Sequence, residues 1–181
     1  MATTIDYYFS LNSPWTYLGH DRLAAMAAEH GKQVRMLAVD FSIVFPATGG
    51  LPLPKRAPAR QAYRLTELQR WRNFVGIELN LHPAHWPADE VNAIGMVMAL
   101  AERATAPDSE AMRLAGAFMR AVWAEEKNIG DRDTILAIAK ETGVDGPALL
   151  EMAAGVAAGR EANSVAAVER GVFGAPSYIY A

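Results

Sequence analysis

The sequence of 181 residues contains no cysteine. Structural disulfides, thiolate zinc sites and dithiol redox chemistry by the protein's own side chains are therefore excluded. Any sulfur chemistry here must use sulfur that arrives with a ligand. The chain also lacks a basic surplus, because 17 lysines and arginines face 20 acidic residues and the formal net charge is −3. Nucleic acid and anionic membranes are accordingly not expected as partners.

Long apolar runs are absent as well. No run approaches the roughly 18 residues of a membrane span, and the opening residues MATTIDYY lack the charged region of a signal peptide. His20, His30 and His82 have no metal-ligand spacing, so no metal is expected. We therefore expect no membrane partner and, by default, a cytoplasmic location. With 51% hydrophobic residues, the chain has room for one sizeable core, or one core with an inserted subdomain.

Residues 5–19, IDYYFSLNSPWTYLG, predict a strand, a tight turn and a helix. Aromatic and β-branched residues at 5–11 are typical of a buried strand. Pro14 suits the first position of a helix, and the apolar residues after it recur at helical spacing. Ser13 is thus predicted to cap a helix at the carboxyl end of a strand. Capping alone stabilises a helix by about 1 kcal/mol, but a hydroxyl at this position can also donate to a bound thiolate or carboxylate.

The next segments predict a change of structure along the chain. Residues 32–41 predict a second strand, parallel to the first in a βαβ unit. Residues 42–57 are rich in proline and glycine and predict a loop. Helical patterns follow at about 59–75, 90–103, 106–126, 133–142, 148–157 and 161–170. The first of these helices carries a broad apolar stripe made of Tyr63, Leu65, Leu68, Trp71, Phe74 and Val75.

The chain closes with residues 171–181, GVFGAPSYIYA, which predict a turn that leads into a strand. Pro176 cannot donate to a strand ladder, so it must stand at the start of that strand. The isomer of the Ala175–Pro176 bond is not determined by the sequence, because about 5% of such bonds in proteins are cis.

The ordered segments FSLNSPWTYLG, ELQRWRNFVGIEL and GVFGAPSYIY resemble a thioredoxin-like family of 2-hydroxychromene-2-carboxylate isomerases and kappa-class glutathione transferases. This family is related to the DsbA-like disulfide oxidoreductases. It carries Ser-Pro where the oxidoreductases carry their first Cys-Pro, and Ser13-Pro14 matches that pair. The segment VFGAP matches the cis-proline turn. The resemblance covers essentially the whole chain.

The fold implied by this resemblance is α/β, with a thioredoxin-like βαβ core and a large all-helical insertion between the second strand and the cis-proline strand. The core comprises residues 1–41 and 171–181. The insertion, with a connecting helix, comprises residues 42–170. The family continues with a further strand and helix, so the core is expected to be incomplete at its C-terminal end.

The function implied by the resemblance is that of a glutathione-dependent isomerase in aromatic catabolism. The thiol adds reversibly to an unsaturated aromatic acid, which permits cis/trans isomerisation. Ser13 with Pro14 would hold the glutathione thiolate, while Ala175, set by the turn at Pro176, would bind its cysteinyl backbone. Relatives are commonly dimers, so a homodimer is expected.

A small aromatic carboxylate also needs groups that bind it. Candidates by position for its carboxylate are Lys55, Arg56, Arg60 and Asn92; the three cations are equally consistent with a solvated surface. Candidates for an aromatic wall are Trp15, Tyr17 and Trp86, which can equally pack in the core. His85 is a candidate acid or base, although a single histidine in a loop is often incidental.

Two alternatives follow from the same residues. The first is a kappa-like transferase that conjugates electrophiles to glutathione. The second is a non-catalytic thioredoxin-fold binding protein in which Ser13 is only a helix cap. A disulfide oxidoreductase is excluded, because the chain has no cysteine.

Overall fold

The computed structural model describes residues 3–180 and contains a three-stranded sheet with the order β2-β1-β3. The central strand is β1 (Thr4–Phe9). It pairs in parallel with β2 (Gln33–Ala38) and antiparallel with β3 (Ser177–Tyr180). The predicted parallel βαβ unit is confirmed, as is a strand that begins directly after Pro176.

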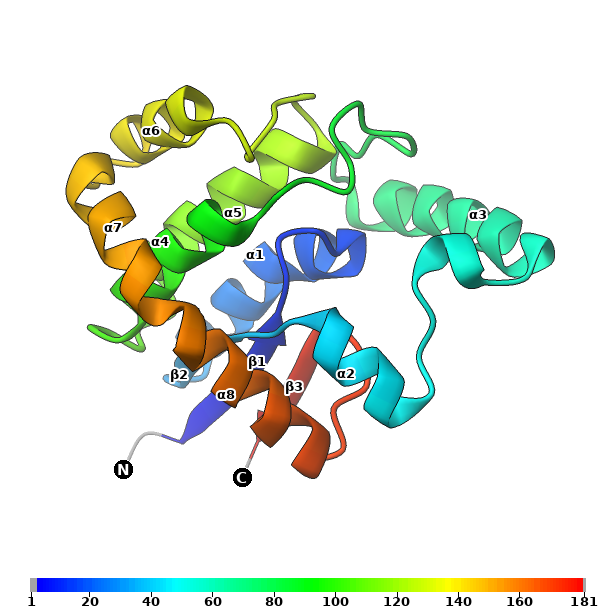
Figure 1. Ribbon diagram of the computed structural model, residues 1–181, viewed down its shortest axis with the longest axis horizontal. Coiled ribbons are helices and arrows are strands. Elements are labelled where there is room, and N and C mark those ends of the chain that lie inside the picture. Colours follow the sequence, from blue (N-terminus) through cyan, green and yellow to red (C-terminus); the bar gives the residue numbers. More distant parts are fainter. Residues whose placement is uncertain (1–2, 181) are drawn as a thin grey trace.

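Helices cover both faces of this sheet, as Figure 1 shows. One face packs against α1 (Pro14–Glu29), and the other against α2 (Phe41–Thr48) and α8 (Ala157–Glu169). Successive side chains of a strand point to opposite faces. Tyr7 accordingly lies in the main hydrophobic cluster with α1, whereas Tyr8 lies in a smaller cluster with residues of α2 and α8.

The segment between β2 and β3 is helical apart from its connections. After α2 it contains a short 3-10 helix at Leu53–Lys55, then α3 (Pro58–Val75), α4 (Val91–Ala101), α5 (Glu110–Trp123), α6 (Arg132–Glu141), α7 (Gly146–Ala153), a second 3-10 helix at Ala154–Val156, and α8. The main hydrophobic cluster joins β1 and α1 to α4 and α5. The predicted core and insertion therefore share one core, and their division into separate units stays a prediction.

The predicted loop at residues 42–57 is wrong for its first half, which forms α2. The Asp40 side chain caps this helix by accepting from the Ser42 N–H at 2.8 Å. Gly49 ends the helix with a left-handed φ of 76°. Pro46 suggested a break, but in a helix of eight residues it costs only one intrahelical hydrogen bond.

The apolar stripe predicted on α3 is largely solvent-exposed. Tyr63, Trp71 and Phe74 are 52%, 46% and 76% exposed, whereas Leu68 is fully buried. Figure 1 shows the reason, since α3 projects from the body of the molecule, where α1 packs against it. Helical spacing indicates which residues share a face, but it does not show that another element covers that face.

Helix boundaries follow the capping residues. Asp131 and Asp145 cap α6 and α7, each accepting from a backbone N–H of the first turn. The helix expected from residue 106 begins only at Glu110, because Ser109 caps it. α8 begins about one turn earlier than predicted, at Ala157.

Candidate functional site

Ser13 stands at the junction of β1 and α1, as the sequence predicts. Its backbone is extended, and its hydroxyl oxygen accepts from the Thr16 N–H at 3.2 Å, while Pro14 occupies the first helical position. The serine is therefore a true N-cap. Its oxygen lies at the positive end of the α1 dipole, which favours a negative charge nearby.

The turn before β3 meets this helix end. The Ala175–Pro176 peptide bond is cis, and the Ser13 hydroxyl donates to the Ala175 carbonyl at 2.9 Å. The two residues are 162 positions apart in the sequence. The contact brings together the two segments, around Ser13-Pro14 and Ala175-Pro176, that carry the resemblance described above.

A cavity of about 460 Å³ opens beside this contact. Aromatic and proline side chains make up most of its wall: Trp15, Phe41, Phe45, Trp86, Phe173, Pro14, Pro52, Pro54 and Pro87. Ser10, Asn12 and Ser13 provide the small polar groups. The charged residues of the lining are Arg56 and Arg64, and no aspartate or glutamate belongs to it. The cavity is thus suited to an aromatic ligand that carries a negative charge.

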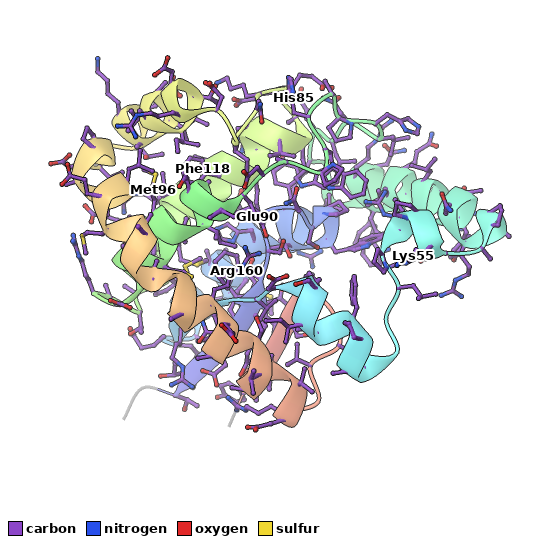
Figure 2. The ribbon with its side chains drawn as sticks, in the orientation of Figure 1. Lys55, His85, Glu90, Met96, Phe118 and Arg160 are labelled. Carbon is purple, nitrogen blue, oxygen red and sulfur yellow. The ribbon has the colours of Figure 1, made fainter. Side chains whose placement is uncertain are left out.

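The predicted site residues divide into two groups. Ser13, Pro14, Trp15, Trp86 and Ala175 all line the cavity, and Pro176 adjoins it in sequence. Lys55 and Asn92 do not line it; both are exposed. Figure 2 shows Lys55 at the side of the molecule next to α3.

Of the remaining candidates, one lines the cavity and three do not. Arg56 lines the cavity, whereas Arg60 is exposed and does not. The Tyr17 hydroxyl donates to the Glu78 carbonyl at 3.0 Å, away from the cavity. His85 is exposed and lies near the top of the molecule in Figure 2.

A buried ion pair beneath the cavity was missed by the sequence analysis. Glu90, directly before α4, pairs with Arg160 of α8, and Figure 2 shows the two together near the centre of the molecule. The Glu90 carboxylate also accepts from the Ser10 hydroxyl at 3.1 Å and from the Asn12 N–H at 3.0 Å. The pair therefore supports the turn that carries Ser13. An acidic residue directly before a strongly apolar helix was the available signal.

Asn12 and Trp86 join this turn to the segment before α4. The Asn12 side chain makes two hydrogen bonds of 2.9 Å with the backbone of Ala88, one donated and one accepted. The Trp86 indole N–H donates to the Asn12 carbonyl at 2.9 Å. Trp86, predicted as an aromatic wall, is thus held by a specific bond next to Ser13.

Arg64 of α3 is the second residue that the sequence analysis missed. Its guanidinium lies 5.0 Å from the centroid of the Trp86 ring, and the residue is only 9% exposed. Burial, together with the nearby Arg56, lowers the pKa of Arg64 from its usual value. Its spacing of four from the buried Leu68 could have placed it on the inner face of the helix.

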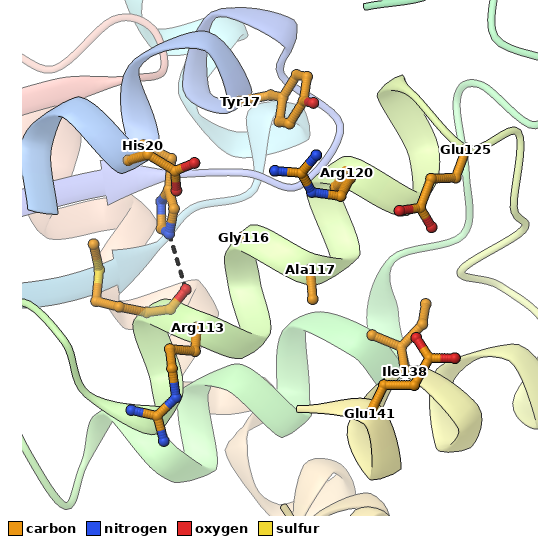
Figure 3. Close-up of a pocket in the computed structure, with 11 residues that line it drawn as sticks. Tyr17, His20, Arg113, Gly116, Ala117, Arg120, Glu125, Ile138 and Glu141 are labelled. Atoms are coloured by element: carbon orange, nitrogen blue, oxygen red, sulfur yellow. Dashed lines mark hydrogen bonds between the residues drawn. The ribbon is translucent and has the colours of Figure 1, made fainter. Parts of the chain in front are cut away.

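A smaller cavity of about 320 Å³ lies between α1, α5 and α6, and Figure 3 shows it. It contains His20, whose Nε2 lies 2.9 Å from the Met112 carbonyl and whose Nδ1 lies 3.0 Å from the Tyr7 hydroxyl. A carbonyl only accepts, so Nε2 carries the proton and Nδ1 accepts from Tyr7. Both nitrogens are occupied, and burial lowers the pKa of His20. His20 is therefore a structural residue.

Residues 3–180 contain neither a cluster of metal ligands nor a membrane-spanning helix. No group of three or more histidine, aspartate or glutamate side chains among them is placed to hold a metal ion. None of the helices in this part of the chain is both long and apolar enough to cross a membrane.

Comparison with known proteins agrees with this geometry. Residues 4–181 match the family described as the DSBA-like thioredoxin domain. A 2-hydroxychromene-2-carboxylate isomerase of Pseudomonas putida is 30% identical over 177 residues, which cover 96% of this chain and 83% of that protein. An isomerase of the same name from Sphingobium xenophagum is 27% identical, with 97% and 88% covered.

Solved structures give the same result. The structure of a 2-hydroxychromene-2-carboxylate isomerase matches with a TM-score of 0.81 at 26% identity, covering 97% of this chain and 84% of the other. The cytosolic disulfide reductase DsbM from Pseudomonas aeruginosa matches with a TM-score of 0.70 at 18% identity, covering 97% and 83%. The second likeness shows the shared fold alone.

Proposed function

The chain belongs to the family of DSBA-like thioredoxin domains, and from this premise we propose that it is a glutathione-dependent isomerase of aromatic catabolism. Its substrate is an unsaturated aromatic carboxylate of the 2-hydroxychromene-2-carboxylate type. The observation that carries the proposal is the cavity at the Ser13–Ala175 contact, which combines an aromatic wall with two arginines and no acid. The named relatives support the reaction class.

The residues around this contact fit a bound thiol peptide. Ser13 offers a hydroxyl at a helix N-terminus, and Ala175 offers a backbone carbonyl beside it. The chemistry that glutathione supplies when bound is a nucleophilic thiol, whose reversible addition converts a double bond into a single bond that can rotate. Because the chain has no cysteine, this nucleophile must come from a ligand.

Ser13 and the α1 dipole would stabilise the ionised thiol. A free thiol has a pKa of about 8.5, so only a few per cent is ionised at neutral pH. Lowering that pKa by two units requires roughly 2.7 kcal/mol of differential stabilisation. A helix N-terminus contributes about 0.3 to 1 kcal/mol and a hydrogen bond to a charged acceptor about 1.5 to 3 kcal/mol. Together they reach the required size.

The Ser13 hydroxyl has one proton, and that proton is engaged by Ala175. Donation to a thiolate therefore requires Ser13 to leave the Ala175 carbonyl. The freed carbonyl, on a half-buried residue of the cavity wall, then needs another hydrogen-bond donor from the cavity. A backbone N–H of the bound peptide meets this need. Ser13 and Ala175 thus act as one exchangeable pair.

The charge of the cavity favours an isomerase over the kappa-like transferase. A transferase that conjugates neutral electrophiles has no need for cations in its substrate pocket. Here Arg56 and Arg64 face the cavity, and no acidic side chain of the lining neutralises them. This arrangement supports a substrate with a carboxylate.

The test compares Ser13→Ala with Ser109→Ala in an ultraviolet titration of bound glutathione. Ser109 is a matched control, because it caps α5 in the same way and lies outside the cavity. Either substitution should cost about 1 kcal/mol of stability through a lost N-cap. A free thiol has a pKa of about 8.5. In the wild type and in Ser109→Ala, thiolate absorbance should appear well below this pH. In Ser13→Ala it should appear at higher pH.

Turnover of an unsaturated aromatic carboxylate completes this test. Loss of a hydrogen bond to a charged acceptor costs about 1.5 to 3 kcal/mol, which corresponds to roughly tenfold to a hundredfold less thiolate, so Ser13→Ala should lose activity on that scale. The glutathione role is wrong if the thiolate titrates identically in Ser13→Ala and the wild type. The binding-protein alternative would then take its place.

A further inference from the structure

Arg64 is a buried cation that faces the cavity without an anion. It is 9% exposed, and its guanidinium rests against the Trp86 ring at 5.0 Å. Among residues 3–180 it forms no ion pair, and no acceptor contributes to the shift of its pKa, which burial and Arg56 both lower. A charge removed from water in this way is unfavourable unless a partner compensates it.

Other arginines that leave the solvent in this protein do have partners. Arg160, whose side chain is 16% exposed, pairs with Glu90. Arg72, on the same helix as Arg64, donates to the Leu79 carbonyl at 2.8 Å. Among the partly or fully buried arginines of residues 3–180, Arg64 is thus the one without a hydrogen bond or ion pair.

Arg64 is also fixed relative to Ser13. Its planar group lies against Trp86, and Trp86 donates to the Asn12 carbonyl at 2.9 Å. Asn12 directly precedes Ser13. A guanidinium held by a cation–π contact keeps its forked N–H donors free for a ligand. Arg64 is therefore positioned by the same turn that carries Ser13.

We propose that Arg64 is the carboxylate-binding residue of this cavity. The ligand is a carboxylate, which matches the fork of a guanidinium in a bidentate pair. Arg56 adds a second positive charge at the cavity, but its Nε already donates to the Leu51 carbonyl at 2.8 Å. Binding of an anion would relieve the repulsion between the two arginines and supply the partner that Arg64 lacks.

This inference deepens the proposed function, because it assigns the contact that would select an acid. Carboxylates from two sources can reach such a site: the carboxylate of the aromatic substrate and the two carboxylates of glutathione. The chemistry is shared, so the experiment must distinguish the two sources. It must also measure binding directly, so that its result does not depend on turnover.

Isothermal titration calorimetry of the full chain provides this measurement. The probes are trans-cinnamate, its neutral amide cinnamamide, and glutathione. The variants are Arg64→Met, which removes the charge and keeps most of the length, and Arg64→Lys, which keeps the charge without the fork. Arg70→Met is the matched control, because Arg70 lies on the same helix and is exposed.

We expect Arg64→Met to weaken trans-cinnamate binding by about tenfold to a hundredfold, the range for a lost hydrogen bond to a charged group. Cinnamamide binding should be unchanged, Arg64→Lys should be intermediate, and Arg70→Met should match the wild type. If the substitution Arg64→Met weakens the binding of glutathione instead, Arg64 still binds a carboxylate, and that carboxylate belongs to glutathione. Circular dichroism of each variant checks that it is folded.

Two results would overturn the proposal. One is an equal loss of trans-cinnamate and cinnamamide binding in folded Arg64→Met, which would mean that Arg64 only shapes the wall. The other is that neither glutathione nor trans-cinnamate responds to the substitution, including the case in which the wild type binds neither. Failure of the glutathione role is detected separately, by the Ser13→Ala titration.

Discussion

The ionisation of His20 is coupled to folding, because its ring is buried. It is 3% exposed, its ring joins Tyr7 of β1 to Met112 of α5, and burial lowers its pKa below the usual 6.5. In the unfolded chain the ring takes up a proton as pH falls through about 6.5. In the folded chain the buried ring takes up a proton only at lower pH. The unfolded state therefore binds more protons below this pH, and stability is lost as pH falls.

We predict that His20→Gln loses this pH dependence. At pH 7.5 the variant should be less stable by about 1 to 2 kcal/mol, because glutamine cannot keep both hydrogen bonds. Between about pH 6.5 and 5 the gap from the wild type should narrow, by at most about 1.4 kcal/mol per pH unit. Urea unfolding followed by tryptophan fluorescence at three pH values measures this gap.

The exposed His85→Gln substitution is the control for that series, since it removes no buried ring. It shows what removal of an exposed histidine does to the free energy of unfolding at the same three pH values. Parallel stability curves for His20→Gln and the wild type would contradict the assignment of His20 as a buried neutral ring.

At the scale of elements, α4 and α7 approach each other at Gly95. A Cβ built on Gly95 would lie 2.7 Å from the Ala153 Cβ and 3.0 Å from its Cα. The two helices are adjacent in Figure 1, and their contact lies on the side of α4 remote from α3. The absence of a side chain at Gly95 thus allows this helix pair to pack.

We predict that Gly95→Ala destabilises the protein by about 1 to 3 kcal/mol through overpacking. This is opposite to the gain of about 1 kcal/mol that alanine gives in an open helix interior. Gly159→Ala is the control in α8, because its Cβ would meet only the flexible end of Met98 at 3.3 Å. It should be neutral or stabilising. Thermal unfolding of both variants measures these changes in stability. A Gly95→Ala variant as stable as the wild type would refute the close approach of α4 and α7.

At the scale of the whole molecule, the Glu90–Arg160 pair joins the two parts of the chain. Arg160 of α8 also donates to the Val39 carbonyl at 3.0 Å, and Glu90 before α4 accepts from Ser10 and Asn12 at the end of β1. Their side chains are 16% and 8% exposed. The pair therefore connects the helical segment to the carboxyl ends of β1 and β2, where the site lies.

We predict that Arg160→Met destabilises the protein by about 3 kcal/mol, because it leaves the Glu90 carboxylate buried without its counter-ion. Adding Glu90→Gln should then cost little, since glutamine keeps an oxygen for Ser10 and Asn12. A double-mutant cycle by urea unfolding measures this coupling. Arg35→Met is the control, because Arg35 pairs with Asp6 but its side chain is 56% exposed, and it should cost about 1 kcal/mol or less.

The same cycle has a result that would contradict it. If Arg160→Met and Arg35→Met cost the same, burial does not distinguish the two ion pairs. The Glu90 network would then not hold the turn that carries Ser13.

Local signals in the sequence were sufficient for most elements. The cap at Ser13, the proline at position 14 and the start of a strand at Pro176 all concern neighbours within a few positions, and all three are confirmed. The same kind of signal failed at α2, where a capping aspartate and a terminal glycine outweigh an internal proline. It failed again on α3, where spacing indicated a face but not a partner for it.

The sequence by itself determined that any sulfur nucleophile must be borrowed and that Ser13 begins a helix. Only the tertiary structure decided what surrounds that serine. Ala175 is 162 positions from Ser13, and Arg160 is 70 from Glu90, so no local pattern encodes these contacts. Nor does composition show that Arg64 lies inward without a partner while Lys55 and Asn92 lie outward. Burial and charge pairing arise when distant segments pack together, and they select the residues that face a ligand.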